Sequence, residues 1–251
     1  PSCDAASSFD HSRKDRSVSA TRTETTLGYW QRLLPPGDAP QAAPPWRLGY
    51  PATLPDGRVL MLPIRALAAD PQRAVASLLI NQASFEVSDA LADLLAQRLA
   101  PLAPDVVIGL PTLGLTLAAA VARRLGHARH VPLGTSRKFW YDEALAAPVR
   151  SITTPDAVKH VYLDPHLLPL VRGQRVVLVD DAISSGSTAP PVWDLVESLG
   201  AQVLAYGVAM QQGRRWQAAL GAGRAARVVG VFDSPLLRAV PEGWVVAASQ
   251  G

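Results

Sequence analysis

From residue 88 onward, short uninterrupted apolar runs alternate with segments in which apolar residues recur every three or four positions. The runs are typical of buried strands and fall at Asp105–Leu110, His130–Leu133, Val161–Leu163, Val176–Val179 and Val203–Met210. The periodic segments predict one helix capped by Ser88, with Leu91, Leu94, Leu95 and Leu99 on one face, and a second helix over Leu115–Leu125. This alternation predicts an α/β fold: a doubly wound, mostly parallel sheet with helices on both faces.

The first third of the chain has a different pattern. Residues 1–26 are rich in Ser, Thr, Asp and Arg and poor in apolar residues, which predicts a disordered leader. Residues 35–51 are proline-rich, which favours an extended, wrapping segment over a helix. Leu54–Leu67 places Pro-Asp-Gly between apolar runs and predicts a hairpin. We therefore divide the chain into a leader (1–26), an N-terminal wrapping segment with a hairpin (27–80) and an α/β core (81–251).

The stretch Val176–Thr188, VVLVDDAISSGST, carries the most specific chemistry of the sequence. Its apolar strand delivers Asp180 and Asp181 to the carboxyl edge of the sheet, where open α/β sheets bind ligands. The loop that follows, Ser184–Thr188, can turn successive backbone N–H groups inward as an anion nest, and the next helix adds its own unpaired N–H groups. The plainer alternative is an ordinary strand–turn–helix connection in which the two aspartates are turn residues.

These residues resemble the phosphoribosyl diphosphate (PRPP) signature of type I phosphoribosyltransferases, and the broader resemblance covers roughly residues 80–235. It implies that Asp180 and Asp181 hold the ribose hydroxyls, as part of the catalytic site, and that the loop holds the 5′-phosphate. The implied ribose 5-phosphate site comprises Asp180, Asp181, Ala182, Ile183, Ser184, Ser185, Gly186, Ser187 and Thr188. The loop pattern is nearest to adenine and other purine enzymes of the family. The resemblance also implies a small hood, built from N- and C-terminal segments, over the base.

A second loop lies between the strand that ends near Leu110 and the helix that follows. The resemblance implies that it binds the diphosphate of PRPP, with the Thr112 hydroxyl as a donor. The implied residues are Leu110, Pro111, Thr112, Leu113 and Gly114. The alternative is a plain connection in which Gly114 packs the helix against the sheet.

A long polar and aromatic stretch, Ser136–Lys159, shows little periodicity and predicts a functional loop. Its cations suit a lid that closes over a diphosphate and keeps water out. By resemblance to the adenine enzymes, Arg137, Lys138 and Lys159 join the diphosphate site. The alternative is a solvated surface loop whose aromatic residues pack locally.

The residues that contact the base are harder to place. Hypoxanthine-guanine enzymes carry a third acid where this chain has Ser184, and they use it for proton transfer near N7 of the purine. That proton-transfer group is absent from this position here. By spacing within the adenine-type pattern, Asp156 is the expected catalytic acid or base, with Asp142 and Glu143 as rivals. In the C-terminal part of the hood, Phe232 and Asp233 are the expected base-binding residues. Core packing of Phe232 is an equally good interpretation. Three further residues follow a strand at the same edge of the sheet and are candidates for ligand contact or for an exposed helix start: Arg214, Arg215 and Trp216.

The amino-acid composition limits which classes of protein this chain can belong to. Hydrophobic residues make up 48% of 251 residues, which is ample for a core. The formal net charge of +3, without strong clustering of basic residues, suits anionic small molecules rather than nucleic acid. Cys3 is the sole cysteine, no apolar run is long enough to span a membrane, and a secretory apolar core is missing, so we expect a cytoplasmic protein without a membrane partner.

Taken together, these features predict a phosphoribosyltransferase that joins the phosphoribosyl group of PRPP to a nitrogen of a purine-like base and releases diphosphate. The resemblance implies Mg²⁺, held mainly by substrate and water, and a homodimer. Two alternatives remain open. One is a related enzyme with another acceptor, such as orotate, a pyrimidine or a specialised amine. The other is a regulator that senses PRPP or a nucleotide without turnover.

Overall fold

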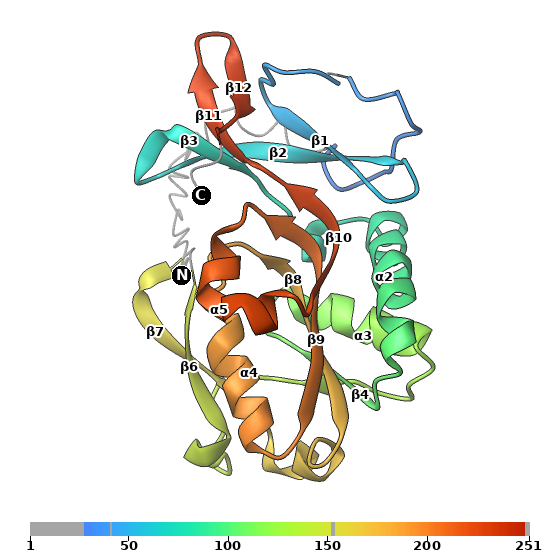
Figure 1. Ribbon diagram of the computed structural model, residues 1–251, viewed down its shortest axis with the longest axis vertical. Coiled ribbons are helices and arrows are strands. Elements are labelled where there is room, and N and C mark those ends of the chain that lie inside the picture. The colour runs from blue at the N-terminus through green and yellow to red at the C-terminus, as the bar shows by residue number, and fades with distance from the viewer. Residues whose placement is uncertain (1–27, 41, 152–153, 249–251) are drawn as a thin grey trace, which may run out of the picture.

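A five-stranded parallel sheet forms the centre of the protein (Figure 1). The computed structural model describes residues 28–40, 42–151 and 154–248, with only the backbone for residues 150, 151 and 154–158, so the expected leader lies outside the described residues. The sheet has the order β10-β9-β8-β4-β5, and every neighbouring pair is parallel. Its strands are β4 (Val106–Gly109), β5 (Val131–Pro132), β8 (Arg175–Ile183), β9 (Gln202–Gln212) and β10 (Val228–Ser234).

Helices cover both faces of this sheet. Helices α2 (Phe85–Leu99) and α3 (Gly114–Arg124) lie on one face, and α4 (Ala189–Ser198) and α5 (Arg215–Ala225) lie on the other (Figure 1). Strand β8 shows why: its alternating side chains enter two cores, with Val177 packed on the α2–α3 side and Leu178 on the α4–α5 side. The expected α/β fold is confirmed. No helix in the described ranges is both long enough and apolar enough to cross a bilayer.

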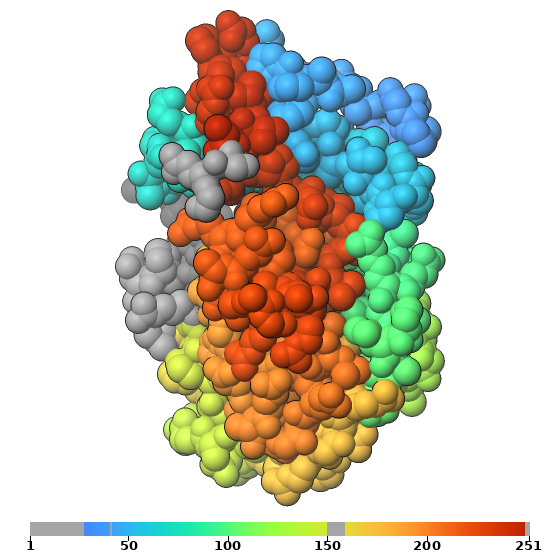
Figure 2. Space-filling view, in the orientation of Figure 1, coloured from blue at the N-terminus to red at the C-terminus, as the bar shows by residue number. Residues whose placement is uncertain are grey.

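A second, antiparallel sheet lies across one end of the core, and we call it the hood sheet (Figures 1 and 2). Its strands, in sheet order, are β1 (Gly49–Thr53), β2 (Val59–Leu67), β3 (Asp70–Ala76), β11 (Leu236–Val240) and β12 (Gly243–Val246). The expected hairpin is β1–β2, and its turn uses a glycine with a φ of +86° at Gly57. The hood sheet therefore joins segments from both ends of the described chain.

The stretch after β5 corrects the sequence analysis. We expected an irregular loop over Ser136–Lys159, but β6 (Ala146–Ser151) and β7 (Thr154–Tyr162) form an antiparallel ribbon there. Apolar residues of the ribbon, Ala147, Val149 and Val161, are buried beside α4. Pro148 lies between the first two, and the cations Arg150 and Lys159 lie close in sequence to the ribbon's buried residues, so this short alternation was hidden. Short 3₁₀ segments connect other elements at Ile80–Gln82, Ala100–Leu102, Glu143–Leu145 and Pro165–Leu170.

The start of α2 also differs from the expectation. Ser84, not Ser88, caps the helix, because the Ser84 hydroxyl accepts a hydrogen bond from the Val87 backbone N–H at 3.2 Å. The Ser88 hydroxyl instead donates to the Phe85 carbonyl inside the first turn. Val87 is fully buried, so the apolar face begins one turn earlier than the leucine spacing alone indicates.

Candidate active site

A cavity of about 1070 Å³ lies between the carboxyl edge of the parallel sheet and the hood sheet. Two loops line it from the core side: the 110–114 loop after β4 and the 184–188 loop after β8. Strands β2 and β3 line it from the hood side. The volume is slightly above the range of about 300–1,000 Å³ that small-molecule sites typically occupy. The place is the one at which open α/β sheets bind ligands.

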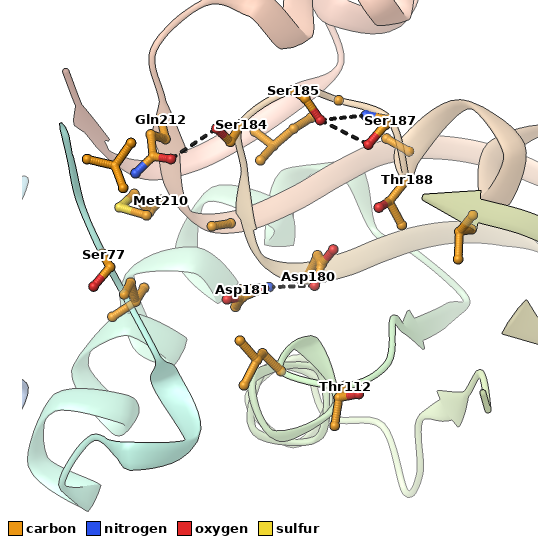
Figure 3. Close-up of a pocket in the computed structure, with 18 of the residues that line it drawn as sticks. Ser77, Thr112, Asp180, Asp181, Ser184, Ser185, Ser187, Thr188, Met210 and Gln212 are labelled. Carbon is orange, nitrogen blue, oxygen red and sulfur yellow. Dashed lines mark hydrogen bonds between the residues drawn. The ribbon is translucent and has the colours of Figure 1, made fainter. Parts of the chain in front are cut away.

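Two adjacent carboxylates stand at the end of β8 and line the cavity (Figure 3). Asp180 accepts hydrogen bonds from the Tyr206 hydroxyl at 3.0 Å and from the Asp181 backbone N–H at 2.9 Å. Burial, followed by the charge of Asp181, raises the pKa of Asp180 well above its usual range, and burial raises the pKa of Asp181. Such a pair is stabilised by a ligand that offers hydroxyl donors or positive charge.

Tyr206 supports Asp180 from the neighbouring strand β9. Burial and the nearby Asp180 charge raise the pKa of the Tyr206 hydroxyl well above its usual value, so it remains a hydrogen-bond donor. Its ring is 1% exposed and belongs to the core on the α4 side. The orientation of Asp180 is thereby fixed by a rigid part of the sheet rather than by a loop.

The 184–188 loop forms a compact turn above the carboxylates (Figure 3). Gly186 has a φ of +77°, and a Cβ atom there would lie 2.9 Å from the Trp216 Cα, so only glycine fits without a shift of α5. The Ser187 N–H donates to the Ser185 hydroxyl oxygen at 3.2 Å. Helix α4 starts directly after the loop, with prolines in its first turn, as expected. The loop therefore leads directly into a helix start, and its role as an anion-binding loop stays a prediction.

The 110–114 loop approaches the carboxylates from the other side, and three of its five predicted residues, Pro111, Thr112 and Leu113, line the cavity. Leu110 does not line it: its side chain is fully buried in the core, and its N–H donates to the Val179 carbonyl at 2.9 Å. A Cβ atom on Gly114 would lie 2.7 Å from the Asp180 Cα, so this glycine lets the loop pack directly against Asp180. The peptide bond between Pro111 and Thr112 is cis.

The predicted cations separate into two groups. Lys159, at the exposed edge of β7, lines the cavity. Arg137 and Lys138 do not line it, and Arg137 forms an ion pair with Glu143 at 2.8 Å. The reason is local: the chain turns after β5 into the Glu143–Leu145 segment, which places Glu143 beside Arg137.

Of the candidate acids and bases, Asp156 lies in β7, but its side chain is outside the described part of the structure. Its role stays a prediction. The rivals Asp142 and Glu143 do not line the cavity. Asp142 accepts a hydrogen bond from the Ala144 N–H at 2.9 Å as the cap of a 3₁₀ segment, and Glu143 is paired with Arg137.

The predicted base contacts are corrected by the structure. Phe232 is 5% exposed and packs in the core on the α2 side, because its position in β10 turns the ring away from the cavity. Asp233 is exposed and does not line the cavity either; its charge adds to the burial that raises the pKa of Tyr50. Of the three residues at the start of α5 that we considered, Arg215 lines the cavity, whereas Trp216 is buried.

The sequence analysis expected a hood but named no residue of β2 or β3 at the cavity, and it also missed three lining residues of β9: Tyr206, Met210 and Gln212. Arg65 lines the cavity from β2, Arg73 from β3 and Ser77 from the position directly after β3, and Gln212 lines it from the end of β9. Arg73, Val75 and Ser77 alternate with buried alanines, Ala74 and Ala76. This period of two is the signal that could have identified a strand with one polar face.

Residues 74–220 match the family model described as the phosphoribosyl transferase domain. That match covers more than half of the chain, and the chain therefore belongs to the phosphoribosyltransferase family, with a type I fold. The protein is 36% identical over 109 residues to an adenine phosphoribosyltransferase from Nocardioides sp., covering 43% of this chain and 55% of that one. It is 34% identical over 113 residues to a xanthine phosphoribosyltransferase from Chloroflexus aurantiacus, covering 44% and 51%.

The chain thus spans about half the length of these curated relatives. Among solved structures, it is similar to the adenine phosphoribosyltransferase from Rhodothermus marinus, with a TM-score of 0.52 and 21% identity. That alignment covers 68% of this chain and 93% of the other. The likeness establishes the fold, which agrees with the sheet order and the helices on both faces described above.

Proposed function

We propose that this protein transfers the phosphoribosyl group of PRPP to a nitrogen of a purine-like base and releases diphosphate. One observation carries the proposal: Asp180 and Asp181 line the same cavity as the 110–114 loop and the 184–188 loop. A vicinal diol suits the carboxylate pair, a terminal phosphate suits the 184–188 loop, and a diphosphate suits the 110–114 loop with Lys159. Membership of the family and the names of the adenine and xanthine relatives support this choice of substrates.

In the proposed reaction, the lone pair of a base nitrogen forms a bond to C1′ of the ribose. The bond between C1′ and the diphosphate oxygen breaks, its electron pair leaves with diphosphate, and the N–H proton of the base passes to water. The sugar passes through a state with oxocarbenium character. The residues of this chain hold ribose and phosphates in line and stabilise the developing charge, and these two effects account for most of the catalysis in reactions of this kind.

We propose that Mg²⁺ participates and is held mainly by substrate oxygens and water. Among the described residues, no group of three or more His, Cys, Asp or Glu side chains could form a metal cage. The Asp180–Asp181 pair fits a bound substrate–metal complex instead, because burial of two like charges favours nearby positive charge. When bound, Mg²⁺ would neutralise charge on the departing diphosphate.

The test is release of diphosphate from PRPP and Mg²⁺ in the presence of purines, pyrimidines, orotate or simple amines. We expect release that depends on one class of acceptor, and none from the double variant Asp180→Asn/Asp181→Asn. The matched control is Asp89→Asn/Asp93→Asn, which changes two exposed carboxylates on α2 that pair with Arg124. Full release by the Asp180→Asn/Asp181→Asn variant would contradict the proposal. Binding of PRPP without release for any acceptor would favour the sensing regulator.

We further propose, from the family resemblance and the single cysteine, a homodimer that works in the cytoplasm. Light scattering on the purified protein tests the first point, with twice the chain mass of 26.6 kDa as the expected result. Fractionation of cells that express the protein tests the second.

A further inference from the structure

Helix α5 begins beside the 184–188 loop, and two contacts join the loop to this part of the chain. Ser184 is hydrogen-bonded to the side chain of Gln212, the last residue of β9, which leads into α5 (Figure 3). At Gly186 the loop lies so close to the helix that a Cβ atom there would be 3.1 Å from the Trp216 Cβ. The loop and the start of α5 are therefore packed as one unit.

The first turn of α5 is held in place by Trp216. Its side chain is 5% exposed, and its Nε1 atom donates to the Gly213 carbonyl at 3.1 Å. Consecutive residues of a helix point about 100° apart, so the residue before Trp216 does not share its buried direction. That residue, Arg215, is exposed and lines the cavity. Arg214, one position earlier, is also exposed but is not part of the lining.

The 184–188 loop brings no charged side chain of its own to a phosphate, since its five residues are serines, a glycine and a threonine. The same cavity contains Asp180 and Asp181, which are shielded from water. Ionised carboxylates repel a phosphate, and burial weakens the screening of that repulsion. A cation beside the loop would offset it.

Four cationic side chains of the described residues line the cavity: Arg65, Arg73, Lys159 and Arg215. The first two belong to the hood sheet, and Lys159 belongs to β7 of the ribbon. Arg215 instead adjoins Trp216, the residue against which the loop packs. Within the described part of the chain Arg215 forms no ion pair, so its guanidinium is available to a bound anion.

We propose that Arg215 binds the 5′-phosphate of the ribosyl substrate together with the 184–188 loop, and that the site thereby selects a doubly charged 5′-group. This inference rests on the proposed function and adds to it a binding residue and a charge requirement. The planar guanidinium matches two oxygens of a phosphate, and its charge offsets that of the carboxylate pair.

The experiment compares ribose 5-phosphate with ribose 5-sulfate, which have the same shape but carry about two and about one negative charge at pH 8. Each is titrated calorimetrically into the full chain. We expect Arg215→Met to bind the phosphate at least ~10-fold more weakly than the unaltered protein does, and to lose less affinity for the sulfate, because hydrogen bonds between charged groups are the stronger class. Arg215→Lys keeps the charge without the planar fork and should recover part of the lost affinity.

The matched control is Arg214→Met, which removes the neighbouring exposed arginine and should leave both affinities unchanged. Should Arg215→Met fail to fold, Arg215→Gln makes the same comparison. Three results overturn the inference: unchanged phosphate affinity in Arg215→Met, equal losses for phosphate and sulfate, or an equal loss in Arg214→Met. Absence of ribose 5-phosphate binding to the unaltered protein instead overturns the proposed function.

Discussion

The Ser184 hydroxyl donates a hydrogen bond to the Gln212 Oε1 atom at 3.0 Å, which ties the 184–188 loop to the end of β9. The other end of the same amide, Gln212 Nε2, donates to the Ala76 carbonyl of β3 at 2.9 Å. The Gln212 side chain is 8% exposed. A single buried amide therefore connects the expected phosphate site to the hood sheet.

The first prediction follows from this connection. Gln212→Ala leaves the Ala76 carbonyl without its partner, which lowers the free energy of unfolding by about 1–3 kcal/mol. It also frees Ser184, so we expect KM for PRPP to rise more than kcat falls. Urea unfolding and steady-state kinetics measure the two effects. The control is Gln202→Ala, at the exposed start of the same strand, and an equal loss of stability there would contradict the account.

The second prediction concerns pH. Because the pKa of Asp180 is raised in the folded state, folding carries a penalty at pH values where the carboxyl is ionised. That penalty is absent below the unfolded-state pKa of about 3.9, grows as pH rises from there toward the raised folded-state pKa, and stays constant above it. Asp180→Asn should therefore increase Tm at pH 8 and have little effect near pH 4.

Thermal unfolding of the ligand-free protein between pH 4 and pH 8 checks this. The control, Asp38→Asn, changes an exposed carboxylate in the N-terminal segment and should shift Tm little across the range. An Asp180→Asn variant that is less stable than the unaltered protein at pH 8 would mean that the Tyr206 and Asp181 hydrogen bonds outweigh the burial of charge.

The third prediction separates two lysines that the sequence placed together. Lys159 lines the cavity and Lys138 does not. Lys159→Met should raise KM for PRPP by about 10-fold, because it removes the proposed charged partner of the diphosphate, whereas Lys138→Met should change KM less than two-fold. Both variants lose one charge, so kinetics at matched ionic strength compare them directly. A larger effect from Lys138→Met would restore the expectation that the segment after β5 closes over the substrate.

Much of the core could be predicted because its signals are local. The run Val176–Val179 is buried on both faces, the doubled carboxylates end it, and small residues continue into a helix whose prolines suit a first turn. These features lie within one continuous stretch of sequence. Their physical requirements, a buried strand, a positive φ and a helix start, are properties of neighbouring residues.

The parts of the fold and of the site that could not be predicted depend on contacts between segments far apart in the sequence. Phe232 and the hood arginines show the difficulty: β10 carries Phe232 into the core, whereas Arg65 and Arg73 reach the cavity because β2 and β3 pair with each other. The β6–β7 ribbon was missed because the buried positions described in it lie beside Pro148, Arg150 and Lys159, which obscure the alternation. Which side chains meet at a cavity is set by sheet order, which no short pattern in the sequence reports.

The most direct test of the central claim is titration calorimetry of PRPP with Mg²⁺ into the unaltered protein and into Asp180→Asn/Asp181→Asn. The account predicts saturable binding of one PRPP per chain to the unaltered protein. It predicts binding at least ~10-fold weaker to the double variant, with circular dichroism showing an intact fold. Binding of PRPP that is equal in the two proteins, or absent from the unaltered protein, would contradict the assignment of this cavity.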